Sequence, residues 1–327
     1  MSSSAKKVIK VSIGFIVTIV LFWFLFRELD FKSFAGYIRS GNKLLISLGV
    51  LVYLSSFAVR AMRWKVLLSH IGSFKIRKLA PVIVAGYAVN NVLPVRIGEI
   101  VRSAIAGKMF KINIPATFAS VFVERVFDGL TIALILSATL FFYPFQENMK
   151  TLAWGASLLF ALLFLFALVS AFSSKPLEFV RFLRGKFPKF LSVFFDFAEK
   201  FLKGAASLDS WQKIVATFSL SLGVWAFELA VYLLISAAFG VKIPFVGCLV
   251  MLCAANLGML AAPTPAGLGV FQGAIVFALE SFSVPYEQRM AVALILHAAQ
   301  IVPTTVIGFI WIWLKNLKID TDAAANP

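Results

Sequence analysis

The sequence predicts an all-α polytopic membrane protein. Of its 327 residues, 61% are hydrophobic and 14% are charged, and the mean hydropathy is +0.92, whereas soluble domains carry about 25% charged residues. Apolar runs such as residues 8–26 and 151–172 approach the roughly 20 residues that cross a hydrocarbon core. Because these runs are continuous and do not alternate with polar residues, a transmembrane β-barrel is excluded.

The formal net charge of +16 is typical of a membrane protein with basic loops. Lys and Arg gather in cytoplasmic loops and favour anionic lipid headgroups. The chain contains no nucleic-acid-binding motif, so we expect no nucleic-acid partner. Its two histidines, His70 and His297, show no metal-ligand spacing, and Cys248 and Cys253 are interpreted as small apolar residues. We therefore expect no metal, no cofactor and no catalytic residue.

The N-terminal part is expected to cross the membrane twice. Lysines between residues 6 and 10 precede the first span and place the N-terminus in the cytoplasm. Residues 27–43 are interpreted as a loop, and a second span covers about 44–59. This span runs into a basic cytoplasmic loop that includes Arg60, Arg63 and Trp64, in which Trp64 is expected to be an interfacial anchor.

Residues 79–93 predict a re-entrant hairpin, because they are apolar but extend only roughly 22 Å as a helix. Asn91 and Pro94 break this segment, and Arg96 returns the chain to the basic side. Backbone that is exposed at membrane depth must be buried in protein or line an aqueous cavity. The break is therefore a candidate site.

A group of ionisable residues follows the break. Pro115 opens a long helix on which Glu124 and Asp128, four residues apart, share one face with Arg125 beside them. An ionisable side chain at membrane depth costs about 3 kcal/mol, so such groups pair or line a wet cavity. One interpretation is a salt-bridge cluster that only fixes helix packing; the favoured interpretation is a polar site for a charged substrate. The expected substrate-binding residues are Arg96, Glu99, Arg102, Glu124, Arg125 and Asp128, with Asn91, Glu228, Gln272 and His297 contributed by other parts of the chain.

The second half of the chain begins with a basic segment, residues 175–210, rich in Phe and Leu. It is interpreted as a pair of amphipathic helices on the inner leaflet, or as a cytoplasmic helical hairpin packed on the core. A span over 211–239 carries Glu228, and a final helix after Pro285 carries His297, either a core histidine or a catalyst. The tail at 320–327 is expected to be disordered. A second break lies between the two spans, at Pro263, Pro265, Gly267 and Gly269.

Two parts of the chain match at an offset of about 170 residues. In chain order the matching pairs are Asn91 and Asn256, Pro94 and Pro265, Gly98 and Gly269, and Pro115 and Pro285. The repeat halves cover about 44–143 and 211–314 of one transmembrane domain, residues 1–327. The charge pattern makes the halves inverted, with about six full transmembrane helices, two re-entrant broken hairpins and both termini cytoplasmic. Transporters often bind substrate between such repeats.

Four motifs together resemble one known family. They are Arg60-Ala-Met-Arg63-Trp64, Asn91-x-x-Pro94-x-Arg96-x-Gly98-Glu99-x-x-Arg102, Glu124-Arg125-x-x-Asp128 and Pro263-x-Pro265-x-Gly267-x-Gly269. The resemblance, over about residues 8–314, is to the lysylphosphatidylglycerol synthase transmembrane-domain family, which includes the flippase half of the multiple peptide resistance factors. Ala266 and Gln272 depart from the family pattern, which often has Gly and Glu there, and the Gln puts a coupling acid at 272 in doubt. The resemblance covers no aminoacyl-transferase domain.

The resemblance implies a lipid flippase-like protein of the cytoplasmic (inner) membrane that translocates a phospholipid or a polyprenyl-linked lipid. Arg96, Arg102 and Arg125 would hold an anionic headgroup through charge-assisted hydrogen bonds. A second copy of the chain or a lipid-modifying enzyme is a further expected partner. Some archaeal relatives are linked to dolichol-sugar transfer, so the alternative is a membrane-embedded glycosyl or lipid transferase, or an accessory scaffold. The absence of a P-loop argues against an ATP-driven pump.

Overall fold

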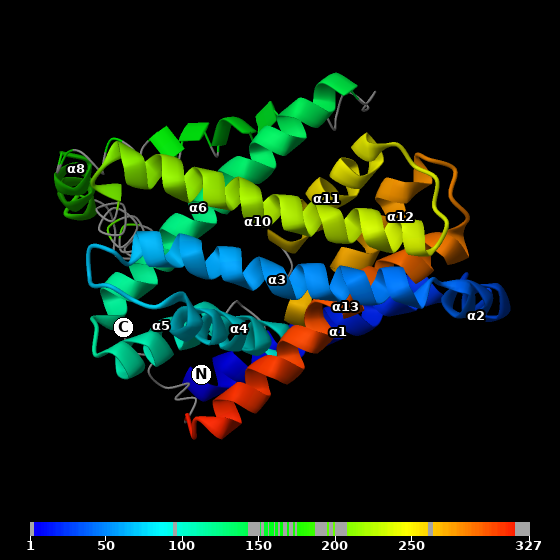
Figure 1. Cartoon of the computed structure of the whole chain (residues 1–327), viewed down its shortest axis with the longest axis horizontal. Coiled ribbons are helices and arrows are strands. Elements are labelled where there is room, and N and C mark those ends of the chain that lie inside the picture. Colours follow the sequence, from blue (N-terminus) through cyan, green and yellow to red (C-terminus); the bar gives the residue numbers. More distant parts are fainter. Residues whose placement is uncertain are drawn as a thin grey trace. The chain divides into compact units, whose positions relative to one another are not determined.

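The computed structural model describes residues 3–93, 97–142, 175–186, 208–260 and 264–317, together with scattered positions between 151 and 199. These residues form eleven α-helices and one 3-10 helix (Figure 1), and the described part of the chain contains no strand. The all-α class predicted from the apolar runs is therefore confirmed. Pro94 and Arg96 of the first break and Pro263 of the second lie outside the described residues, as do positions 320–327.

Three described helices are long and apolar enough to cross a membrane. They are α3 (Lys43–Leu67), α10 (Trp211–Ala238) and α13 (Tyr286–Leu314). The shortest of them, α3, has 25 residues and extends roughly 37 Å at about 1.5 Å per residue, more than the ~30 Å of a hydrocarbon core. These helices identify a multi-pass membrane protein. The predicted total of six crossings includes segments outside the described residues and stays a prediction.

The N-terminal region differs in one place from the sequence prediction. After α1 (Ser3–Phe26), residues 31–40 were expected in a loop, but they form the short helix α2 (Phe31–Ser40). Asp30 is its N-cap: the carboxylate accepts hydrogen bonds from the backbone amides of Lys32 and Ser33. A side-chain acceptor at this position satisfies donors that would otherwise lack a helical partner. The sequence Asp30-Phe-Lys-Ser33 contained this N-cap, which indicates the start of a helix.

The described residues pack as two compact units. The first unit contains Met1–Ser56, Val84–Gly98 and Ala226–Leu317, and the second contains Phe57–Ile83 and Glu99–Trp225. The boundaries between them fall inside α3, α4 (Ile76–Val92), α10 and the first residues of α5 (Ile97–Phe110). Four of the described helices therefore contribute to both units.

Two short helices followed by a long helix occur in each half of the chain, in the order that the sequence repeat predicts. In the first half, α4 is followed by α5 (Ile97–Phe110) and the long helix α6 (Ile114–Phe142). In the second half, α11 (Phe245–Leu260) is followed by α12 (Val270–Glu280) and α13. The helices have 17, 14 and 29 residues in the first half and 16, 11 and 29 in the second. This match supports the repeat, whereas its inversion across the membrane stays a prediction.

A side-chain amide ties down the backbone after each break. At the first break, the Gly98 amide donates to Asn90 Oδ1 at 2.7 Å. At the second, the Gly269 amide donates to Gln272 Oε1 at 2.8 Å. Gly98 also lies so close to α4 that a Cβ there would be 2.0 Å from the carbonyl oxygen of Gly86. Only glycine permits this approach of two helices.

The second break turns through residues that adopt left-handed backbone conformations. A 3-10 turn, η3 (Pro265–Gly267), connects α11 to α12. Within and after it, Gly267 and Gly269 have φ values of +72° and +83°, which glycine adopts freely. Ala266, at φ +52°, has no such freedom, because its Cβ crowds the backbone in this region. The predicted break at Pro265, Gly267 and Gly269 is confirmed as a structural feature.

Beyond residue 174, α8 (Lys175–Arg184) confirms a helix at the start of the predicted amphipathic segment. Phe179 and Phe182 are exposed on it, while Arg181 and Arg184 pair with Glu199. Most positions between 187 and 207 lie outside the described residues. Whether this segment lies on the inner leaflet stays a prediction.

Candidate functional site

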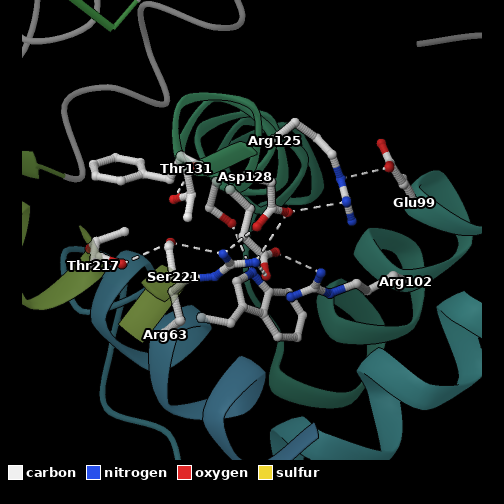
Figure 2. Close-up of polar contacts among 12 residues, drawn as sticks. Arg63, Glu99, Arg102, Arg125, Asp128, Thr131, Thr217 and Ser221 are labelled. Carbon is white, nitrogen blue, oxygen red and sulfur yellow. Dashed lines mark hydrogen bonds and ion pairs between the residues drawn. The ribbon is translucent and has the colours of Figure 1, made fainter. Parts of the chain in front are cut away.

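Six charged side chains form one network in the second unit (Figure 2). They come from three helices, α3, α5 and α6, and consist of three cations and three anions: Arg63, Arg102, Arg125, Glu99, Glu124 and Asp128. Within this set the formal charges cancel. Buried charges persist when they are paired in this way.

Arg63 lies at the centre of the network and is completely buried. Its Nη1 donates to Asp128 Oδ1 at 2.5 Å and its Nη2 donates to Glu124 Oε1 at 2.9 Å. A further hydrogen bond runs from Nη1 to Ser221 Oγ on α10, at 2.9 Å. The planar fork of the guanidinium allows one side chain to hold two carboxylates at once. Arg63 therefore joins α3 to α6 and α10.

Arg102 of α5 is the second arginine that binds Glu124. Its Nη1 donates to Glu124 Oε2 at 2.7 Å, and its Cζ lies 3.7 Å from the centre of the Trp64 ring. Trp64 is itself fixed, because its Nε1 donates to Ser120 Oγ at 3.0 Å. A buried cation over an indole face is attracted by the ring quadrupole. Glu124 is thus held between Arg63 and Arg102.

Arg125 forms the outer part of the network. Its Nε lies 2.9 Å from Glu99 Oε1, and its Nη1 donates to Asp128 Oδ2 at 3.2 Å. The side chain of Arg125 is 28% exposed and that of Glu99 is 13% exposed, whereas Arg63, Arg102 and Glu124 are at most 2% exposed. The network therefore has a sealed inner group and an accessible ion pair, Arg125–Glu99.

The network contains five of the predicted site residues and one that was missed. Glu99, Arg102, Glu124, Arg125 and Asp128 lie together as expected. Arg96, which was grouped with them, lies outside the described residues.

The missed residue is Arg63, and its neighbour Trp64 was wrongly placed. Both were assigned to a basic cytoplasmic loop, but α3 continues to Leu67 and both side chains are fully buried. Trp64 is therefore no interfacial anchor. The positive-inside pattern predicted a loop position for Arg63, which instead pairs with two buried acids. The Arg60-x-x-Arg63-Trp64 motif was the available signal, since its two arginines lie three residues apart and share a helix face.

The other predicted site residues lie in the first unit, in separate polar groups. Glu228 of α10 accepts a hydrogen bond from Gln300 of α13 at 3.0 Å, and both are buried. Asn91 of α4 donates to Thr305 Oγ1 at 2.9 Å. It also donates to the carbonyl of Ile301 at 3.3 Å, which ties α4 to α13.

Gln272 and His297 form a hydrogen-bonded chain that holds the second break. Nε2 of His297 lies 3.1 Å from the carbonyl oxygen of Ala266, which can only accept, so this nitrogen carries the hydrogen. Its Nδ1 then accepts from Gln272 Nε2 at 2.9 Å. The ring also stacks on Phe271 with a centroid distance of 4.2 Å. These contacts favour the interpretation of His297 as a core histidine.

Within the described part of the chain, no group of three or more His, Cys, Asp or Glu side chains could hold a metal ion. The contacts that the structure shows within the network are ion pairs. Arginine side chains bind phosphate and carboxylate groups through paired N–H donors. Of the three arginines in the network, Arg125 has the most exposed side chain.

Comparisons with known proteins agree with these observations. The family model for the lysylphosphatidylglycerol synthase TM region matches residues 11–308. The UPF0104 membrane protein MJ1078 of Methanocaldococcus jannaschii is 26% identical over 239 residues, which cover 71% of this chain and 95% of that protein. Glycosyltransferase AglD of Haloferax volcanii is 29% identical over 121 residues, which cover 37% of this chain. The match spans only 19% of the length of AglD.

Proposed function

Because the chain belongs to the lysylphosphatidylglycerol synthase TM region family and is a multi-pass membrane protein, we propose that it translocates a lipid with a phosphate-bearing headgroup across the cytoplasmic membrane. The observation that carries the proposal is the partly exposed Arg125 at the edge of an otherwise sealed charge network. Charged groups at membrane depth that face a cavity mark substrate pathways.

The two interpretations of the charged residues apply to different parts of the network. The inner group, with Arg63 at its centre, has the burial and mutual pairing of a structural cluster. The outer pair, Arg125–Glu99, has the access that a ligand needs. A headgroup phosphate would bind Arg125 in place of the Glu99 carboxylate. The inner charges would keep α3, α5 and α6 in position while this exchange occurs.

The location of Glu99 supports this role. It lies in the first turn of α5, directly after the first break. The N-terminus of a helix carries a partial positive charge, and discontinuous helices supply such ends at the substrate sites of transporters. Anionic groups are favoured there. Arg96, which precedes α5, is proposed as a second phosphate ligand.

The proposal includes the topology that the sequence predicts: six crossings, two inverted halves and both termini in the cytoplasm. A phospholipid or polyprenyl-linked lipid with an anionic headgroup is the proposed substrate. The amide ties at Gly98 and Gly269 would hold the two breaks in place while lipid passes.

A second candidate function is a membrane-embedded transferase, which the similarity to part of glycosyltransferase AglD favours. Such an enzyme would make a new covalent lipid product, whereas a translocator returns the lipid unchanged. Mass spectrometry of lipids that have been incubated with the purified protein distinguishes the two. A new product that disappears in Arg125→Ala would replace translocation with transfer.

Translocation is tested with purified protein in liposomes that contain a fluorescent phospholipid. We expect wild-type protein to move this lipid between leaflets and Arg125→Ala to lose the activity while remaining folded. Arg27→Ala is the matched control, because Arg27 is an exposed arginine that pairs with Glu28 outside the network. A folded Arg125→Ala variant with wild-type transport would refute the proposed site.

A further inference from the structure

Glu99 differs from the other two acids of the network in how many arginines hold it. Glu124 is paired with both Arg63 and Arg102, and Asp128 is paired with both Arg63 and Arg125. Among the described residues, Glu99 has its ion pair with Arg125. In the part of the chain that the structure describes, one arginine thus balances Glu99, whereas two balance each of the others.

This difference decides what happens when an anion binds. If a headgroup phosphate takes Arg125, Asp128 keeps Arg63 and Glu124 is unaffected, but Glu99 loses its counter-charge. Its side chain is only 13% exposed, so water solvates the carboxylate poorly. The partial positive charge at the N-terminus of α5 favours the ionised form only weakly, by less than the cost of a poorly solvated carboxylate without an ion pair, and the usual relief is protonation.

We propose that Glu99 takes up one proton when the phosphate of an anionic lipid displaces the Glu99 carboxylate from Arg125. This inference rests on the proposed lipid site. The proton comes from hydronium or from the acid form of the buffer: its bond to that donor breaks as an O–H bond forms on the Glu99 carboxylate. Before binding, three arginines balance three carboxylates. After binding, they balance Glu124, Asp128 and the phosphodiester. The total charge of the six described side chains and the phosphodiester stays zero, because each anionic lipid enters with a proton.

The charged groups around Glu99 support its assignment as the proton acceptor. On α6 these are Arg125, its ion-pair partner, and Asp128, which shares that arginine. On α5, Arg102 lies about one helical turn further along and is bound to Glu124. Arginine side chains do not lose their proton in proteins. Arg96, on the N-terminal side, lies outside the described residues.

Coupled uptake has a measurable consequence. Because binding consumes a proton, a rise in pH opposes it, and affinity for an anionic lipid falls by up to about tenfold per pH unit while Glu99 is ionised in the free protein. Glu99→Gln mimics the protonated side chain. Its affinity for the same lipid should therefore be independent of pH and at least equal to that of the wild type at neutral pH.

The experiment uses the purified full chain in detergent and dioctanoyl phosphatidylglycerol as the probe. Calorimetric titrations in two buffers with different ionisation enthalpies give the number of protons taken up per lipid. We expect about one proton for the wild type and none for Glu99→Gln. Glu178→Gln is the matched control: it removes an exposed carboxylate on α8 and should leave the uptake unchanged. Dioctanoyl phosphatidylcholine should bind without a proton, because its ammonium group can balance Glu99.

The outcomes separate the inference from the proposed function. Binding of the anionic lipid to wild type without proton uptake overturns the inference and leaves the lipid site standing. Uptake that persists in Glu99→Gln shows that another group takes the proton and also overturns it. Failure of both lipids to bind refutes the proposed function itself. If Glu99→Gln does not fold, Glu99→Asp replaces it: this variant keeps a carboxylate, so proton uptake must persist.

Discussion

The guanidinium of Arg102 lies over the indole of Trp64, with Cζ 3.7 Å from the ring centre, and both side chains are buried. The two residues are on different helices, α5 and α3. This stacking positions the arginine that holds Glu124, so the packing of an apolar ring and the pairing of charges depend on each other.

Replacement of Trp64 should therefore destabilise the protein more than the loss of one aromatic ring. Trp64→Ala removes the ring under Arg102 and should lower the free energy of unfolding by about 3–5 kcal/mol. Trp64→Phe keeps a ring but loses the bond to Ser120 Oγ, and should cost about 1 kcal/mol. Detergent-induced unfolding, followed by circular dichroism, measures both. Equal stability of the two variants would show that the stacking contributes nothing.

The inner and outer arginines should respond differently to truncation. Arg63→Ala leaves Glu124 and Asp128 short of a counter-charge in a sealed site and should cost about 3–5 kcal/mol. Arg125→Ala affects a partly solvated pair and should cost about 1 kcal/mol or less. Thermal unfolding in detergent distinguishes them, with Arg27→Ala as a surface control. The division into a sealed group and an accessible pair would be wrong if Arg125→Ala were as unstable as Arg63→Ala.

The left-handed backbone at Ala266 predicts a stabilising substitution. Ala266→Gly removes a Cβ from a residue with φ +52° and should raise the free energy of unfolding by about 1 kcal/mol. Ala255→Gly makes the same chemical change inside α11, where it should lower stability by about 0.5–1 kcal/mol. The two variants should therefore shift the unfolding midpoint in opposite directions. A shift in the same direction would contradict the backbone argument.

The close packing of α4 and α13 in the first unit predicts that replacing one glycine by alanine destabilises the protein. A Cβ at Gly308 would lie 2.5 Å from Ala88 Cβ and 2.9 Å from the carbonyl oxygen of Val84. Gly308→Ala should therefore push the helices apart and cost about 1–3 kcal/mol. The control is Gly273→Ala on α12, where a Cβ meets nothing within 4 Å; it should be neutral or stabilising. Thermal unfolding of both variants tests the contact.

The cap of α2 predicts a dependence on pH. Hydrogen bonds from the Ser33 hydroxyl and the Lys32 amide lower the pKa of Asp30 below its ordinary value. A lowered pKa means that the cap stabilises α2 above the ordinary pKa of aspartate, about 3.9, and loses this effect as the pH falls through the lowered value. Amide exchange in α2, corrected for intrinsic rates, should therefore accelerate in acid. Asp30→Ala should show fast exchange at every pH.

Patterns along single helices were predictable from the sequence, whereas contacts between helices were only partly so. The spacing of Glu124 and Asp128 placed both on one helix face, and the short apolar segments at 79–93 and 244–262 predicted the short helices α4 and α11. Pairing partners depend on how the helices pack. Arg63 is 61 residues from Glu124, and nothing local distinguishes an arginine that enters the core from one that ends a span. The same reason explains the error at Trp64.

In the repeat, too, local features were predictable from the sequence and hydrogen-bond partners were not. Proline, glycine and asparagine marked both breaks, because these residues change the backbone locally. The hydrogen bonds that hold the breaks use Asn90 in one half and Gln272 in the other. These two residues occupy different positions relative to their breaks, one before and one after, so alignment of the halves does not pair them.

Both breaks are tied by amide side chains and not by carboxylates. An amide has no net charge, so a transmembrane voltage, which acts with about 2.3 kcal/mol per elementary charge per 100 mV, exerts no net force on these ties. Deamidation would replace a neutral amide with a charged carboxylate, on which the voltage does exert a force. A carboxylate at position 272 could still accept from the Gly269 amide, but it has no N–H for Nδ1 of His297. Deamidation of Gln272 would thus place a charge that responds to voltage at the second break and would remove the hydrogen bond to His297.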